Sequence, residues 1–209
     1  VPSVVCYEGS HTIIGREARE RLGQAGLGVQ GNVVRSPKTL LGRESVFVGG
    51  VERSPVDVVR EVVEFVRRQA LDAKTVRNLE ADRAVVTIPV MMEGHRRALL
   101  RDAFRMAGMS VVQFVHEPLA ALYGYLRSSD DFEAALRRYD RQLVLVFDWG
   151  GGTLDLTLCR LVDGLLIQVG NDGTDEVGGD WFDAELKNEV ERRVRATRSL
   201  SGDVEVQAE

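Results

Sequence analysis

The stretch DWGGGTLDLT, residues 148–157, constrains the fold of this chain more than any other part of its sequence. It follows the wholly apolar run LVLVF, which predicts a buried strand, and it leads into alternating apolar and polar residues that predict a second strand. Three consecutive glycines let backbone N–H groups approach an anion closely, because no Cβ blocks them. The stretch therefore predicts a strand–turn–strand unit that binds phosphate.

Two common phosphate-binding loops do not fit this stretch. A Walker A loop needs a lysine and a helix directly after its glycines, and the glycine-rich dinucleotide-binding fingerprint also leads into a helix. Here a hairpin follows, so we expect Asp148 to hold Mg²⁺ through water and Thr153 to offer its hydroxyl to a phosphate. The alternative is a plain β-hairpin with a flexible glycine turn and a capping aspartate.

The composition excludes several classes of protein. With 209 residues, 44% of them hydrophobic, the chain can bury a core as one large domain or as two small lobes. A net charge of -5 with scattered Lys and Arg gives no basic footprint for nucleic acid, and no apolar run approaches the ~20 residues that span a bilayer. Cys6 and Cys159 lack metal-spaced neighbours, so we expect two reduced, buried thiols. We expect a cytoplasmic protein with no nucleic-acid or membrane partner.

Periodicity and turn signals predict alternating helices and strands along the chain. Ser54 is expected to cap a helix whose first residue is Pro55. Further helices are predicted over 16–24, 94–108, 117–126, part of 128–140 and 178–194. Strands or hairpins are predicted over 3–15, 46–53, 83–89, 109–115, 142–147 and 154–170. The strands at 83–89 and 142–147 are expected to be buried, because their residues are mostly apolar.

The glycine stretch and four other segments resemble the seventy-kilodalton heat-shock chaperone family of the DnaK type, in which the glycine stretch usually reads DLGGGTFDVS. The other segments, in the same order as in the family, are VPSVVCY, VVRSPKTLLGR, the stretch from AVVTIP to HEPLAALYGYL, and TDEVGGDWFD. The likeness runs from Val1 to about Val194. It implies an α/β fold of the actin-like ATPase type, with a ribonuclease H-like motif and two lobes around a nucleotide cleft, here incomplete.

The resemblance also implies roles for the residues that match the family's nucleotide site. Lys38 would orient the attacking water, Glu117 would lie near the Mg²⁺ and the hinge, and Asp148 would help to position metal and water. Thr153 would lie near the γ-phosphate of ATP. The glycines expected to contact the phosphates are Gly150, Gly151, Gly152, Gly178 and Gly179.

Two residues match positions that tell a substrate domain whether ATP or ADP is bound, namely Pro89 and Arg97. Each residue also has a plain structural interpretation. Lys38 can be a solvated loop charge, Glu117 a first-turn acid that interacts with the helix dipole, and Gly178-Gly179 a simple turn. Pro89 can be a strand terminator and Arg97 a surface helix charge.

Departures from the family pattern indicate a divergent and partial member. Leu119, Trp149 and Met91-Met92 replace the usual residues, and the connector at 128–142 is longer than usual. The family's first phosphate loop would precede Val1 and its adenosine contacts would follow Glu209, so we expect an internal fragment. The expected parts are the outer part of lobe I (1–54), the core of lobe I (55–139), the start of the lobe II core with the phosphate hairpin (140–177), and the start of outer lobe II (178–209).

We therefore expect a fragment of the ATP-binding and ATP-hydrolysing domain of a DnaK-like chaperone. Its partners would be client polypeptides, bound through a substrate domain, and co-chaperones, and the fragment alone would be inactive. Two alternatives remain open from the sequence. One is a small-molecule kinase on the same fold, and the other is a non-catalytic actin-like scaffold protein.

Overall fold

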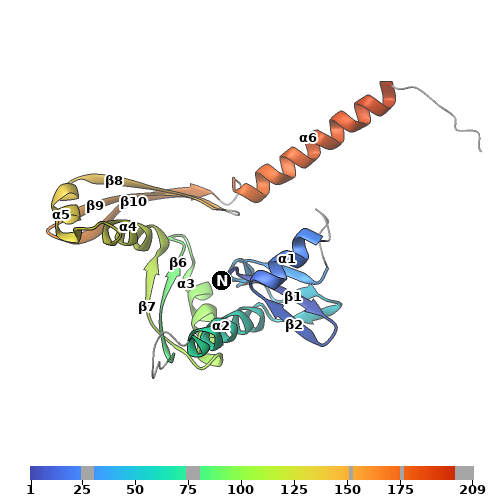
Figure 1. Cartoon of the computed structure of the whole chain (residues 1–209), viewed down its shortest axis with the longest axis horizontal. Helices are drawn as coiled ribbons and strands as arrows, with labels where there is room; N and C mark the ends of the chain where they lie inside the picture. The colour runs from blue at the N-terminus through green and yellow to red at the C-terminus, as the bar shows by residue number, and fades with distance from the viewer. Residues whose placement is uncertain (25–30, 74–80, 151–152, 175–176, 201–209) are drawn as a thin grey trace, which may run out of the picture. The chain divides into compact units, whose positions relative to one another are not determined.

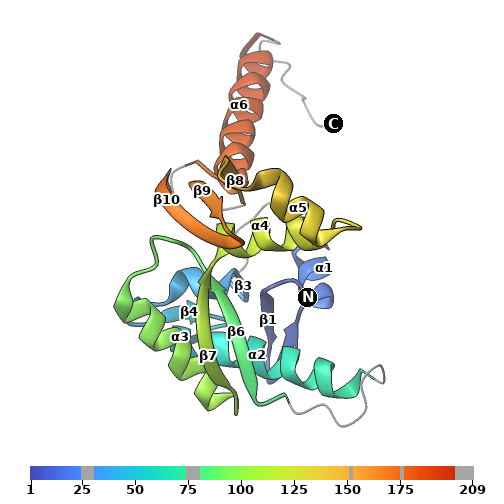
Figure 2. The ribbon, with the colours of Figure 1, turned by 90° about the vertical axis from the view of Figure 1, so that its left-hand side faces the viewer.

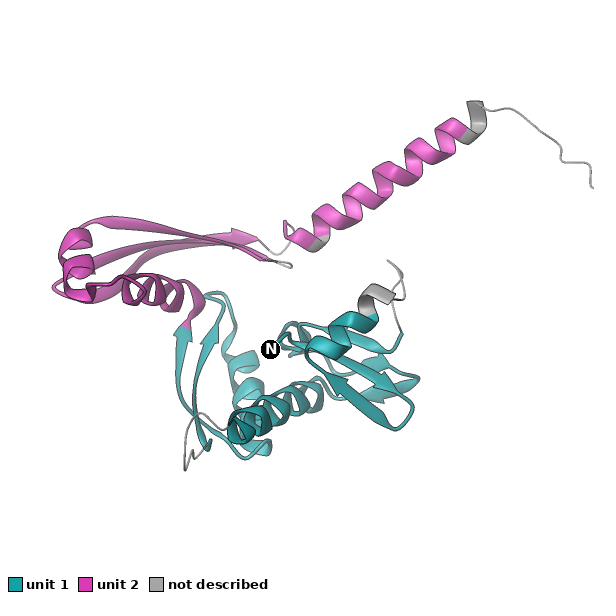
Figure 3. Ribbon diagram, in the orientation of Figure 1, with its two compact units in different colours: residues 1–115 teal, residues 116–209 magenta. Residues whose placement is uncertain are grey.

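The computed structural model describes residues 1–24, 31–73, 81–150, 153–174 and 177–200, which belong to two compact units (Figure 3). Unit 1 is Val1–Val115 and unit 2 is His116–Glu209. These described residues form a mixed α/β structure with two three-stranded sheets and two two-stranded sheets (Figure 1). None of the helices in the described ranges is both long and apolar enough to cross a membrane.

Unit 1 is built from small antiparallel sheets at its start and a strand–helix–strand segment at its end. Its strands are β1 (Val4–Glu8), β2 (His11–Ile14), β3 (Val33–Arg35), β4 (Val46–Val48), β5 (Val51–Arg53), β6 (Arg83–Ile88) and β7 (Ser110–His116). Its helices are α1 (Arg16–Gln24), the 3₁₀ helix η1 (Pro37–Leu40), α2 (Pro55–Asp72) and α3 (Gly94–Met106). The β1–β2 and β4–β5 pairings confirm both hairpins that the sequence predicts in this part.

Helix α2 is the central packing element of unit 1. It begins as predicted, because the Ser54 hydroxyl accepts a hydrogen bond from the N–H of Val56 and Pro55 occupies the first turn. One side of its apolar stripe, at Val58, packs with β1, β2, β3 and β4. The adjacent side, at Val59 and Val63, packs with η1, α3 and the end of β6. In this way α2 joins the small sheets to the β6–β7 pair, whose two strands lie side by side in Figure 2.

Unit 2 contains one antiparallel sheet with helices on one of its faces. The sheet has the order β10–β9–β8, from β8 (Leu143–Trp149), β9 (Leu154–Val162) and β10 (Leu165–Thr174). The helices of this unit are α4 (Glu117–Arg127), α5 (Phe132–Tyr139) and α6 (Gly179–Leu200). Leu122 and Leu126 of α4 pack on Cys159 of β9, and α4 runs along this face in Figure 1. The predicted β9–β10 hairpin is confirmed.

The structure corrects the prediction that the strands at 83–89 and 142–147 are buried. On β8 the side chains of Leu143, Leu145 and Phe147 are 51%, 59% and 58% exposed, and on β6 Val85 is 64% exposed. A continuous apolar run is typical of a strand that is covered on both faces. Within the described residues, α4 and α5 cover only one face of the β8 sheet, so alternate apolar side chains remain exposed. Both cysteines are free and buried, as predicted.

The burial of β6 gives a direct test of the unit 1 core. Ile88 is fully buried among residues of α2 and α3, whereas Val85 on the same strand is exposed. We expect Ile88→Ala to lower the free energy of unfolding by about 2–5 kcal/mol, because it removes buried apolar atoms and leaves a cavity. Val85→Ala is the matched control and should change it by less than about 0.5 kcal/mol. Urea unfolding measures both, and equal effects of the two substitutions would contradict the assigned core.

Candidate functional site

The glycine turn, defined here as residues 150–153, connects β8 to β9 in unit 2. The N–H of Gly150 donates a hydrogen bond to the carbonyl oxygen of Thr153 at 2.9 Å, which closes the turn. Two of the predicted phosphate contacts, Gly151 and Gly152, lie outside the described residues. The strand–turn–strand arrangement itself is the one that the sequence predicts, because β9 and not a helix follows the turn.

Two carboxylates lie opposite each other beside this turn. The antiparallel register pairs Asp148 of β8 with Asp155 of β9, and both residues are partly buried. Directly opposed side chains of an antiparallel pair have Cβ atoms about 4.5–5.5 Å apart, and like charges there destabilise the sheet. Carboxylate oxygens are preferred ligands of Mg²⁺ in proteins. The donor set at this pair therefore fits a divalent cation that keeps several water ligands.

The sequence analysis did not single out Asp155, although a signal for it was present. Strands that pair antiparallel around a short turn place residues at equal distances from the turn opposite each other. Residues 148 and 155 satisfy this relation for a turn at 150–153. Among the described residues, no group of three or more His, Cys, Asp or Glu side chains is arranged to hold a metal ion, so the Asp148–Asp155 pair is a two-carboxylate site.

The hydroxyl of Thr153 is engaged within the turn. Its Oγ1 donates a hydrogen bond to Oδ2 of Asp155 at 3.0 Å. A threonine hydroxyl has one hydrogen to donate. In this conformation Thr153 therefore orients the Asp155 carboxylate, and it can donate to another acceptor only after releasing that oxygen.

The start of α6 is joined to the glycine turn. The N–H of Gly179 donates to the carbonyl oxygen of Gly150 at 3.0 Å. The backbone N–H groups of Trp181 and Phe182 both donate to the carbonyl oxygen of buried Gly178, at 3.1 and 3.2 Å. The Trp149 and Phe182 rings also meet edge to face, with centroids 5.3 Å apart. The structure thus brings together the turn and the glycine pair, which are separate segments in the sequence.

These contacts also limit which amides can bind an anion directly. Gly150 and Gly179 use their N–H groups inside the chain, so their contribution is to fix the turn against the helix. The N-terminus of a helix carries partial positive charge and favours anions. Because α6 begins at the glycine turn, its positive end lies at the same place as the turn.

Glu117 lies at the start of α4, in the first turn of that helix. The preceding residue, His116, is the N-cap, and its Nδ1 lies 2.7 Å from Oε1 of Gln168 on β10. The Gln168 amide nitrogen donates to Asn171, so its Oε1 is the acceptor and the His116 Nδ1–H is the donor. This bond ties the residue before Glu117 to the sheet. No sequence signal pointed to it, because the two residues are 52 positions apart and a β-bulge follows Gln168.

Lys38 lies in unit 1 on the short helix η1, which is fixed from several sides. Pro37 before it is buried, and Leu41 after it is only 2% exposed and belongs to the core. The Arg96 guanidinium of α3 donates to the backbone oxygens of Lys38 and Thr39, at 3.4 and 3.1 Å. The backbone at Lys38 is therefore held against α3, while its side chain is partly exposed.

Pro89 and Arg97 lie in one local network of unit 1. The N–H of Met92 donates to the carbonyl oxygen of Pro89 at 3.1 Å, and Nε of Arg97 donates to the carbonyl oxygen of Met92 at 2.8 Å. The Met92 side chain is 4% exposed and packs in the core. Arg97 is thus bonded to the loop between β6 and α3, which differs from the plain interpretation of a surface charge.

The predicted site residues divide between the two units. Lys38, Pro89 and Arg97 belong to unit 1, and the others in the described ranges belong to unit 2. Within unit 2 the structure joins Gly150, Thr153 and Gly179 and sets Asp148 on the strand that enters the turn. The predicted meeting of Lys38 with the glycine turn involves both units and stays a prediction, as do the chemical roles of all these residues.

Comparison with known proteins identifies a family and several relatives. The family described as Hsp70 protein matches residues 44–208. The chaperone protein DnaK of Deinococcus radiodurans is 30% identical over 201 residues, which covers 87% of this chain and 30% of that protein. DnaK of Mycoplasma mycoides is 28% identical over 200 residues, covering 95% and 31%. An HscA homologue of Pseudomonas fluorescens is 29% identical over 206 residues, covering 88% and 31%. The chain therefore spans about three tenths of the length of these relatives.

The approach of β10 to the Asp155 segment can be tested with one methyl group. A Cβ on Gly173 would lie 2.8 Å from the backbone oxygen of Leu154 and 3.1 Å from Oδ1 of Asp155, whereas a Cβ on Gly170 of the same strand has no neighbour within 4 Å. We expect Gly173→Ala to destabilise the chain by about 1–3 kcal/mol because the backbone must shift. Gly170→Ala should be close to neutral. Thermal unfolding of both variants is the measurement, and a neutral Gly173→Ala would show that β10 does not constrain Asp155.

Proposed function

Because the chain belongs to the Hsp70 protein family, we propose that it forms part of the ATP-binding and ATP-hydrolysing domain of a DnaK-like chaperone. Its ligands are ATP or ADP with Mg²⁺. The observation that carries this proposal is the glycine turn, joined through Gly150 to the start of α6, with Asp148 and Asp155 beside it. Together these features supply backbone donors, a positive helix end and two carboxylates in one place.

The glycine turn and α6 hold the phosphate oxygens of the nucleotide. Gly150, Gly179, Trp181 and Phe182 use their N–H groups within the chain. The direct donors that we propose are therefore Gly151 and Gly152, the phosphate contacts that the sequence predicts. Thr153 adds its hydroxyl once it releases Asp155, because that hydroxyl has a single hydrogen.

Asp148 and Asp155 hold the metal ion, in part through water. When bound, Mg²⁺ supplies positive charge that neutralises oxygens of the β- and γ-phosphates. The like charges of the opposed carboxylates repel each other in the free protein, so the pair favours a bound cation. Glu117, in the first turn of α4, acts in the complete domain as the acid that the family resemblance places near the metal ion and the hinge.

The reaction is phosphoryl transfer to water. The oxygen of a water molecule forms a bond to the γ-phosphorus, the bond from that phosphorus to the bridging oxygen breaks, and ADP leaves. The water proton passes to the released phosphate or to solvent. Lys38 aligns the attacking water, and its anchored position on η1 supports this role because alignment needs a rigid base.

The complete domain has the actin-like architecture of two lobes around the nucleotide, divided in this chain at 1–54, 55–139, 140–177 and 178–209. Pro89 and Arg97 signal the nucleotide state to a substrate domain that binds client polypeptides, and co-chaperones act on the same cycle. The shared contacts of Pro89 and Arg97 with Met92 support a common role for the two residues.

The role of Lys38 separates catalysis from binding. We predict that Lys38→Ala in the complete gene product lowers single-turnover ATP hydrolysis by on the order of 10²–10³, or roughly 3–4 kcal/mol of barrier. The nucleotide Kd should change less than about tenfold, because Lys38 acts where charge changes during transfer. Single-turnover hydrolysis and equilibrium binding on the same variant make the measurement.

The control for Lys38 is Lys187→Ala, which removes the same charge from the surface of α6, where Lys187 lies beside Glu191. It should leave both hydrolysis and binding unchanged. Unchanged hydrolysis in Lys38→Ala would make Lys38 a solvated loop charge. A parallel loss of binding would instead make it a ground-state phosphate ligand.

The carboxylate pair predicts that loss of one carboxylate weakens nucleotide binding but stabilises the free protein. We expect Asp148→Asn and Asp155→Asn each to weaken Mg²⁺-dependent nucleotide binding by about 10- to 100-fold, as is typical when groups that hold a metal through water are lost. Without Mg²⁺ and nucleotide, each substitution should raise the free energy of unfolding by a few tenths of a kcal/mol, because it removes a like-charge contact. Calorimetric titration and urea unfolding measure the two effects.

The matched control for the pair is Asp163→Asn, which removes the same charge from the turn at the other end of β9. Its affinity for MgATP should equal that of the unaltered protein. If Asp148→Asn left both the affinity and its metal dependence unchanged, Asp148 would be a turn residue and the site would lose its metal ligand.

A further inference from the structure

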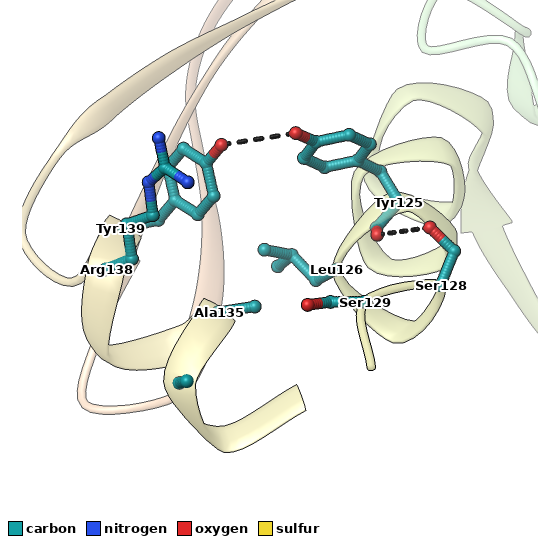
Figure 4. Close-up of a pocket in the computed structure, with 8 residues that line it drawn as sticks. Tyr125, Leu126, Ser128, Ser129, Ala135, Arg138 and Tyr139 are labelled. Carbon is teal, nitrogen blue, oxygen red and sulfur yellow. Dashed lines mark hydrogen bonds between the residues drawn. The ribbon is translucent and has the colours of Figure 1, made fainter. Parts of the chain in front are cut away.

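Unit 2 has a hollow between α4 and α5, called here the α4–α5 pocket, whose lining differs from that of the glycine turn (Figure 4). It has a volume of about 310 Å³ and lies between the end of α4, the turn that follows it and helix α5. Its lining residues are Tyr125, Leu126, Ser128, Ser129, Ala134, Ala135, Arg138 and Tyr139. None of them belongs to the glycine turn, its flanking strands or α6.

The base of the pocket is apolar and ordered. Leu126 is 1% exposed, and it packs with Ala135 and Tyr139 in the cluster that fixes α4 and α5 to the sheet. Asp131 caps α5, because its carboxylate accepts a hydrogen bond from the N–H of Ala134 at 2.9 Å. The two walls of the pocket are therefore held in place, as a site for a small ligand requires.

The pair of phenol groups at the rim of the pocket has one hydroxyl hydrogen left to donate to a ligand. The hydroxyl oxygens of Tyr125 and Tyr139 lie 3.3 Å apart, and their rings meet edge to face. This hydrogen bond raises the pKa of the Tyr125 phenol. One of the two protons lies between the oxygens, and the second is directed to solvent or to a ligand acceptor.

The other polar groups of the pocket also donate. Arg138 contributes a guanidinium beside the Tyr139 ring, 5.6 Å from its centroid. The Ser128 hydroxyl is engaged by the carbonyl oxygen of Tyr125 at 2.7 Å, whereas the Ser129 side chain points into the hollow in Figure 4. The lining contains one cation and no carboxylate. Hydrogen-bond donors around an apolar base fit a ligand that carries an anionic, acceptor-rich group on an apolar body.

We propose that the α4–α5 pocket binds a small organic anion, with its carboxylate or phosphate at Arg138 and the Tyr125–Tyr139 pair and its apolar body on Leu126 and Ala135. This site is separate from the nucleotide site and does not depend on it. Six of its eight lining residues come from the connector at 128–142.

The probes for this proposal are phenylacetate, phenyl phosphate, inorganic phosphate and neutral 2-phenylethanol, titrated into the ¹⁵N-labelled full chain. We expect phenylacetate or phenyl phosphate to shift the backbone NMR signals of residues 125–139. The one that binds more tightly shows whether the pocket prefers a carboxylate or a phosphate head group. The neutral alcohol should bind at least about tenfold more weakly, because it lacks the charge that Arg138 meets. Inorganic phosphate alone should also bind more weakly, because it lacks the apolar body.

Arg138→Gln should weaken binding of the aryl anion by about tenfold or more. The control is Arg137→Gln, the same change one position earlier on α5 and outside the pocket, which should leave this binding unchanged. Tyr139→Phe provides a second variant, which removes the phenol pair and keeps the ring. Each variant's thermal unfolding is measured alongside. The proposal would be overturned if the alcohol bound as tightly as the aryl anion, or if no probe bound at millimolar concentration. It would also be overturned if Arg138→Gln and Tyr139→Phe left the affinity unchanged, or if Arg137→Gln lost as much affinity as Arg138→Gln.

Discussion

The antiparallel register of β8 and β9 is the constraint on which the candidate nucleotide site depends. It sets Asp148 opposite Asp155, and a pair of like charges in that position costs a sheet roughly 0.2–1 kcal/mol relative to neutral partners. A bound cation converts this cost into an attraction. Thr153 lies two residues before Asp155, so the two side chains lie on the same face of this extended segment and form a hydrogen bond. A shift of β9 by one residue would turn Asp155 to the opposite face of the sheet and separate the two carboxylates.

The glycine turn and helix α6 are linked, so a change at the turn can affect the position of the helix. A hydrogen bond from the N–H of Gly179 to the carbonyl oxygen of Gly150 joins the turn to the start of a helix that runs from Gly179 to Leu200. The Trp149–Phe182 ring contact lies beside this bond. In the proposed site, a phosphate at the turn would also meet the positive end of this helix, so we propose that nucleotide binding and the position of α6 are coupled through the same few atoms. Coupling of this kind suits a domain that reports its nucleotide state.

Local features of the fold could be predicted from the sequence, whereas features set by distant contacts could not. The Ser54 cap, the hairpins and the strand–turn–strand unit depend on neighbouring residues, so turn chemistry and periodicity predict them. The contact of His116 with Gln168 depends on packing across 52 positions, which no local pattern encodes. The sequence did not predict the exposed face of β8. A continuous apolar run is compatible with a strand that is covered on both faces, but it does not show that anything covers the second face. Asp155 could have been predicted from the sequence, because the symmetry of the hairpin places it opposite Asp148.

Hydrogen exchange on the complete gene product, with and without MgATP, tests the account most directly. The account holds that one nucleotide orders the glycine turn and the start of α6 together. Peptides covering 148–157 and 177–183 should therefore slow their exchange in parallel, with the same dependence on nucleotide concentration, and both effects should require Mg²⁺. Protection of only one of these segments, or of neither while nucleotide binds, would contradict the claim that the turn and the helix form a single phosphate site.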